Sequence, residues 1–192
     1  MTIAIAPVQT VAPTNTPVSL FVARAHLRVD GSEEDELIAS LIDVAVSHLD
    51  GWSGILGRCL MTQTWRQDMG CFPPFLRLPF PNVQSVTVQY YDASNALQTV
   101  SAANYFLVNR VDGAAVELAS TASWPSHYLR PDAVQITMVC GYTSVPPSIK
   151  AAILLHVAHL FVNREPVNIG NITTMLPFAY DALGSKYRMV GV

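Results

Sequence analysis

The side chains whose types and spacing could do chemistry in this chain are a pair of histidines, a set of cysteines and an acidic run. His156 and His159 lie three residues apart in a helical pattern, so their imidazoles could share a metal ion. The cysteines supply no ligands at a matching spacing, and the nearest carboxylate is Glu165. We therefore expect these histidines to pack in a core or in a seam between subunits, and we predict neither a metal nor a cofactor.

The cysteines and the acidic run favour structural roles. Cys59, Cys71 and Cys140 are widely spaced and contain no C-x-x-C motif, which is typical of reduced, buried thiols; a disulfide or a metal site is the alternative. The acidic run at 33–36 lacks the glycine and the alternating ligands of a calcium loop. It indicates the first turn of a helix, where the helix dipole favours negative charge.

Sequence motifs of common enzyme classes are absent. The chain contains no G-x-S-x-G, no phosphate-binding glycine loop and no H-E-x-x-H. We therefore predict that the protein is not an enzyme and has no catalytic residues.

The composition is unusually apolar for a chain of this length. Of its 192 residues, 51% are hydrophobic and 13% are charged, whereas about a quarter charged is usual. The most apolar stretch, 151–162, is shorter than the roughly 20 residues that span a bilayer, and the N-terminus lacks the basic region of a signal peptide. We expect a soluble protein, made in the cytoplasm, that buries apolar surface against other chains.

The charge pattern argues against tight nucleic-acid binding. The net charge is −3, and the arginines and lysines are scattered rather than clustered. Tight phosphate binding needs clustered cations that displace counterions. The sequence is compatible with DNA that passes nearby without being held.

The apolar spacing changes along the chain from helical to alternating and back to helical. We expect an extended arm over 1–16 and a first helical part over 17–58. Short alternating runs between turn residues predict an inserted antiparallel β domain over 59–144, and a second helical part follows over 145–192. The predicted fold class is α+β: a helical bundle of four helices, two before and two after a small antiparallel β domain.

The helix expected over 148–164 is apolar around almost its whole surface, so both of its sides must be covered. One row of side chains suits the core of the subunit. The opposite row is predicted to form the contact between subunits and contains Leu154, Leu155, Ala158 and Val162.

The C-terminal segment combines residue types that are enriched at the centres of protein interfaces, namely aromatic residues, arginine and methionine. They are Tyr180, Tyr187, Arg188 and Met189. Packing of this helix on its own domain is the alternative.

Several sequence segments, taken in order, resemble the phage head–tail connector (adaptor) family. They are PVSLFVARAHLRVD with EEDELIASLIDVAVSHLDGWSGILGRCLMTQTW, then LPFPNVQSVTVQYYD, VPPSIKAAILLHVAHLFVNREP and LPFAYDALGSKYRM. The resemblance covers about 17–189 and is to the branch with a β insertion, which occurs in long-tailed phages, prophages and gene transfer agents.

The resemblance implies a ring of about twelve subunits in the neck of a virion or phage-like particle. Such a ring docks beneath the portal protein, receives the stopper or tail-completion protein, and surrounds the channel for double-stranded DNA. The predicted portal-docking residues are Phe178, Tyr180, Tyr187, Arg188 and Met189. A stopper or tail-completion role is the main alternative. A small ligand-binding domain or enzyme is a remote one, because the sequence offers no convergent polar set for a pocket.

Overall fold

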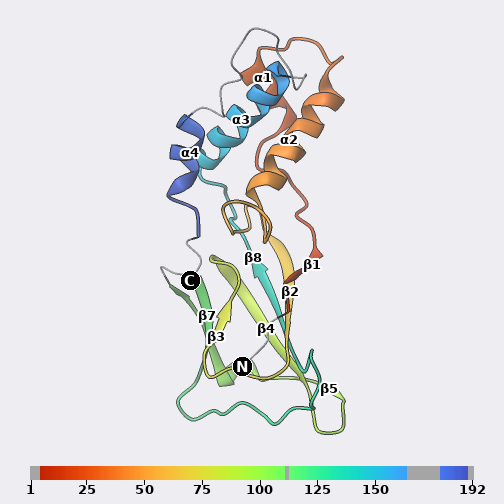
Figure 1. Ribbon diagram of the computed structural model, residues 1–192, viewed down its shortest axis with the longest axis vertical. Helices are drawn as coiled ribbons and strands as arrows, with labels where there is room; N and C mark the ends of the chain where they lie inside the picture. The colour runs from red at the N-terminus through yellow and green to blue at the C-terminus, as the bar shows by residue number, and fades with distance from the viewer. Residues whose placement is uncertain (1–4, 111–112, 164–177, 190–192) are drawn as a thin grey trace. The chain divides into compact units, whose positions relative to one another are not determined.

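The computed structural model describes residues 5–110, 113–163 and 178–189 (Figure 1). Contacts within the chain divide it into two compact units. The first, here called the β unit, comprises Met1–Thr14, Met61–Thr143 and Met189–Val192. The second, the helical unit, comprises Asn15–Leu60 and Ser144–Arg188.

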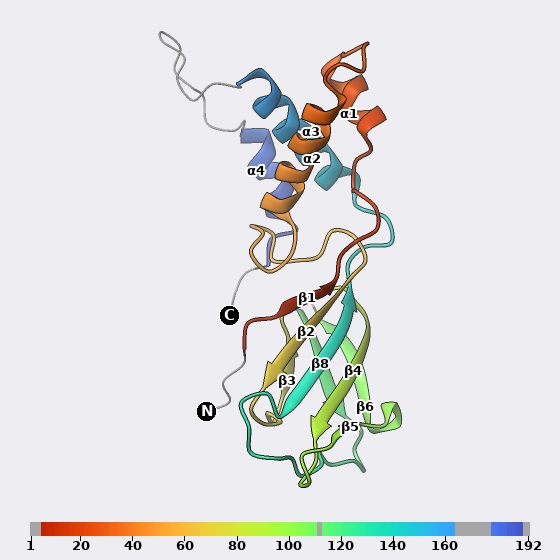
Figure 2. The same ribbon diagram turned by 90° about the vertical axis from the view of Figure 1, so that its right-hand side faces the viewer.

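The larger sheet of the β unit contains five strands in the order β1-β2-β8-β4-β5. The strands are β1 (Val8–Val11), β2 (Gln63–Met69), β8 (Val134–Cys140), β4 (Val83–Tyr91) and β5 (Leu97–Thr99). All neighbouring strands are antiparallel, and a register shift interrupts the β1–β2 pairing between Gln9 and Val11. The central strand β8 lies between β2 and β4 (Figure 2).

The smaller sheet contains three antiparallel strands in the order β3-β7-β6. They are β3 (Leu76–Leu78), β7 (Gly113–Leu118) and β6 (Tyr105–Arg110), and a short 3₁₀ helix (Ala102–Asn104) precedes β6. Side chains of β6 join this sheet to β4. The Tyr105 hydroxyl donates to the Val86 carbonyl at 3.2 Å, and the Asn109 side-chain amide bonds to both backbone groups of Val83.

The core of the β unit follows the alternation of the strands. On β8 every second side chain is fully buried, namely Val134, Ile136, Met138 and Cys140. Successive side chains of a strand point to opposite faces, so this row lies on one face of the larger sheet. Phe80 and Val88 are buried with it.

The helical unit is built around α3, which contacts the three other helices. The helices are α1 (Leu20–Leu27), α2 (Asp35–Leu49), α3 (Pro147–Val162) and α4 (Phe178–Ser185). Pro147 begins α3, because proline has no amide hydrogen to lose in a first turn. The α2 core row, at helical spacing, contains Ile38, Ile42, Ala45 and Leu49.

The predicted four-helix bundle is wrong. The described residues form four helices, but they also form eight strands in two sheets, so the chain is rich in sheet. Two of the helices, α1 and α4, have only eight residues each, whereas α2 has 15 and α3 has 16. The helix α1 stops at Arg28, which adopts a left-handed conformation with φ 59°. Helices this short cannot pair along the whole length of α2 and α3 as a bundle requires.

Candidate functional site

The helix α3 has one covered side and one partly open side. Its covered side contains Ile149, Ala152, Ile153, His156 and Val157, all buried in the helical unit. The row predicted for contact between subunits lies outside this set: Leu154, Leu155 and Ala158 are half-buried. Val162, in the same row, is 77% exposed. The open side therefore carries apolar surface that another chain could cover, and the interface role of these residues stays a prediction.

Other helices of this unit also expose apolar side chains. On α1, Phe21 is 80% exposed and Val22 is 44% exposed, and Val44 on α2 is 50% exposed. Trp52, in the segment after α2, is 51% exposed. Sequence reasoning missed Phe21, because an apolar residue in a short helix gives no sign of which side the rest of the chain will cover.

The predicted docking residues do not share one environment. Tyr180 is buried, with 3% of its surface exposed. Tyr187 is half-buried, with the Arg58 guanidinium 5.8 Å and the Lys186 ammonium 4.9 Å from its ring centroid. Arg188 is exposed and Met189 is half-buried. The side chain of Phe178 lies outside the described residues.

Tyr180 belongs to a cluster of rings where α2, α3 and α4 meet. The ring centroids of His156 and Tyr180 are 5.3 Å apart, and those of His48 and His156 are 5.2 Å apart. The Tyr180 hydroxyl lies 3.5 Å from Nδ1 of His156. Burial lowers the pKa of His156 below its usual 6.5, and the nearby imidazoles of His48 and His159 lower it further. Sequence reasoning paired His156 with His159 but missed His48, which only the fold brings close.

Within the described part of the chain, no cluster of three or more His, Cys, Asp or Glu side chains could hold a metal ion. Glu165, the carboxylate nearest in sequence, lies outside the described residues. Cys59 and Cys140 are buried, and Cys71 is half-buried.

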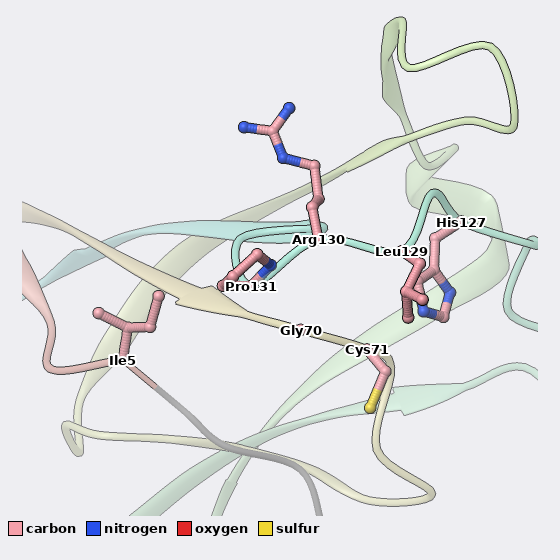
Figure 3. Close-up of a pocket in the computed structure, with 7 residues that line it drawn as sticks. All are labelled: Ile5, Gly70, Cys71, His127, Leu129, Arg130 and Pro131. Atoms are coloured by element: carbon pink, nitrogen blue, oxygen red, sulfur yellow. The ribbon is translucent and has the colours of Figure 1, made fainter.

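A pocket of about 510 Å³ lies in the β unit (Figure 3). Its lining is largely apolar and consists of Ile5, Gly70, Cys71, His127, Leu129, Arg130 and Pro131. The Arg130 guanidinium points away from Cys71 and Leu129 in Figure 3. It donates hydrogen bonds to the Asp132 carboxylate, and its central carbon lies 3.8 Å from the ring centroid of Tyr91. The hydrogen bond from Arg130 is the main cause of the lowered pKa of Asp132. The charged member of the lining is thus held by its own neighbours rather than aimed at a ligand.

Across residues 5–110, 113–163 and 178–189, no helix combines the length and the apolarity of a bilayer span.

No family model matches the chain, and no curated protein matches it. Solved structures do match. A chain in the neck of an empty gene transfer agent particle (C6 symmetry) is 22% identical, with a TM-score of 0.76 over 98% of this chain and 97% of that one. A chain in the virion of a native gene transfer agent particle is 21% identical, with a TM-score of 0.77 over the same shares. A third, in the neck of a native particle (C12 symmetry), is 19% identical, with a TM-score of 0.68 over 95% and 97%.

These matches define the class of fold. The chain has, over nearly its whole length, the fold of proteins that occur in gene transfer agent particles. The resemblance noted in the sequence is therefore confirmed at the level of the fold.

Proposed function

We propose that this chain is a structural subunit of the neck of a phage or phage-like particle, made in the bacterial cytoplasm and located at the portal vertex. The observation that carries the proposal is the fold shared with a gene transfer agent neck protein over 98% of this chain. The apolar composition supports the same role, because a particle subunit buries much of its surface against other chains. A catalytic role is not part of the proposal.

Within the neck, we propose the role of head–tail adaptor, in a ring of about twelve copies with cyclic symmetry. The matched neck structures carry C6 and C12 symmetry, which supports a ring for this fold. In such a ring each subunit offers two different faces to its neighbours. The open side of α3, with Leu154, Leu155, Ala158 and Val162, is the proposed subunit contact because it is apolar and incompletely covered.

The C-terminal segment is the proposed contact with the portal protein. Tyr187, Arg188 and Met189 are exposed or half-buried, so a partner can reach them. Tyr180, which belongs to the same proposed set as Phe178, can contact a partner only if α4 leaves its place on α3.

The proposed ring surrounds double-stranded DNA without reading its sequence, and a stopper or tail-completion protein binds the face away from the portal. Ion pairs between arginines and carboxylates support the proposal that the chain contacts DNA phosphates only weakly. Arg24, Arg66 and Arg130 form ion pairs with Asp35, Asp68 and Asp132, and Arg110 pairs with Glu117. A guanidinium already held by a carboxylate displaces fewer counterions from DNA.

The experiment that tests this role mixes the purified chain with isolated portal rings and measures co-sedimentation. We expect direct binding that the double substitution Tyr187→Ala and Arg188→Glu abolishes. Ala182→Glu, an exposed change on α4, serves as the matched control and should bind like the parent chain. Binding only to portal rings that already carry another neck protein would favour the stopper or tail-completion role. Absence from purified particles would refute the neck assignment itself.

A further inference from the structure

The buried contact between α4 and α3 depends on a side chain that can take up a proton. His156 is 7% exposed and Tyr180 is 3% exposed, and the two meet through their rings and through the hydroxyl–Nδ1 approach of 3.5 Å. When the ring proton sits on Nε2, the Tyr180 hydroxyl donates to Nδ1. A second proton on Nδ1 reverses the roles, so that Nδ1–H donates to the hydroxyl oxygen; what opposes protonation is therefore the burial of a cation and not the loss of a hydrogen bond.

Among the described side chains, the two groups that lower the pKa of His156 by Coulombic interaction are both imidazoles. The helix α2 presents His48, α3 itself presents His159, and α4 presents the neutral phenol of Tyr180. Among the described side chains, no carboxylate contributes to the pKa shift of His156. Asp181 follows Tyr180 on α4, but its side chain is outside the described set. A proton on His156 therefore adds a buried cation beside two further imidazoles.

The lowered pKa of His156 makes closure of this seam depend on pH. An opened seam exposes His156 to water, so the open state binds the proton at a higher pH than the closed state does. The stability that this residue contributes is fully present above about pH 6.5. It is lost as the pH falls from that value towards the lowered pKa of the closed state.

The element that this loss affects most is α4. It has eight residues and contains Gly184, and helices this short are marginal without packing. Tyr180 provides the packing against α3, and Gly184 lies against Leu56, where an added Cβ would be 3.6 Å from a Leu56 methyl carbon. Opening of α4 alone therefore requires less free energy than unfolding of α2 and α3.

We propose that α4 is a proton-operated latch: neutral His156 holds Tyr180 and keeps α4 on the helical unit, and protonated His156 releases it. The released state would expose Tyr180 and the rest of α4. The latch stands without the neck assignment, because it needs only contacts within this chain.

Hydrogen–deuterium exchange of the full chain at pH 7.5 and pH 5.0, corrected for intrinsic exchange rates, tests the latch. We expect protection of α4 to fall by about threefold or more at the lower pH, while protection of β8 and of the middle of α2 stays constant. In His156→Phe, which keeps a buried ring but cannot titrate, protection of α4 should be the same at both values. His26→Gln, an exposed histidine on α1, is the matched control and should retain the fall.

Equal protection of α4 at both pH values in the parent chain would overturn the latch, and so would an unchanged fall in His156→Phe. Asp181→Asn should also retain the fall, and its loss there would assign the effect to the carboxylate instead. If His156→Phe does not fold, the ring of His156 in the parent chain can be titrated by NMR. A midpoint at or above 6.5 would then contradict the proposal.

Discussion

The two units of the chain differ in how their cores are closed. In the β unit, β8 buries an uninterrupted apolar row between two paired strands, and polar groups of β6 bond directly to the backbone of β4. In the helical unit, the core includes a titratable histidine, and one side of its central helix stays partly open. Both units leave large apolar side chains exposed, for example Leu129 at 93% and Val162 at 77%, so the difference lies in the cores themselves. The core of the β unit is closed by paired strands, whereas the core of the helical unit contains a group that can take up a proton.

The largest effect on the β unit is expected from Gly141→Ala. Gly141 has φ 121°, and an added Cβ would lie 2.1 Å from the Met61 carbonyl oxygen, so the backbone itself must move. We expect a loss of about 3 kcal/mol or more in the free energy of unfolding, measured by denaturant titration. Gly70→Ala is the matched control, because a Cβ added at Gly70 would lie 3.6 Å from its nearest neighbour, the Pro131 carbonyl oxygen. Similar losses for both would contradict the assigned strain.

The second-largest loss of unfolding free energy is expected from a cavity in the buried row of β8. Ile136→Ala removes a fully buried side chain and should cost about 3 kcal/mol of unfolding free energy. Thr137→Ala, the next residue on the opposite, partly exposed face, should cost less than about 1 kcal/mol. If the two losses are equal in the same denaturant titration, the division of β8 into a covered and an open face is incorrect.

On the helical unit the contrast predicts a change in assembly rather than in folding. Val162→Glu places a charge on the open side of α3 and should change the free energy of unfolding by less than about 0.5 kcal/mol. Incorporation of the variant into particles should fall at least about tenfold in quantitative immunoblots, because a buried unpaired charge opposes the subunit contact. Ala39→Glu, exposed on α2, is the comparison that should assemble normally. Normal incorporation of Val162→Glu would remove this side of α3 from the ring contact.

The smallest effect is expected in the turn between β4 and β5. Hydrogen bonds from Ser94, Ala96 and Gln98 lower the pKa of Asp92 from 3.8 to about 2. Because the folded state holds the carboxylate, its contribution is present above pH 3.8 and is lost as the pH falls towards 2. Asp92→Asn should therefore lower the Tm slightly at pH 7 and not at pH 2. A difference in Tm that is independent of pH would contradict this role.

Sequence periodicity carried most of the information on local structure. The rows of α2 and α3 and the alternation of β8 are strong because burial imposes their spacing. The short strand β1 has only four residues, so its pairing with β2 could not be read from its own pattern. The bundle prediction failed in part because α1 ends at Arg28, whose left-handed backbone conformation cannot be inferred from apolar spacing.

The candidate site was less predictable than the fold. Aromatic residues are typical both of cores and of interface centres, so the composition of the C-terminal segment could not tell Tyr180 from Tyr187. What buries Tyr180 is its contact with His48 and His156, which lie far from it in sequence. Such contacts depend on how helices pack, and that packing cannot be predicted from a single sequence.

We propose that other subunits of a particle neck complete the helical unit. The most direct test is an image reconstruction of the portal vertex from particles of the producing cells, with the chain located by a fused tag. We expect a closed ring of this chain next to the portal, with the open side of α3 against a neighbouring copy. Intact, tail-bearing particles without the tag at that vertex would contradict it.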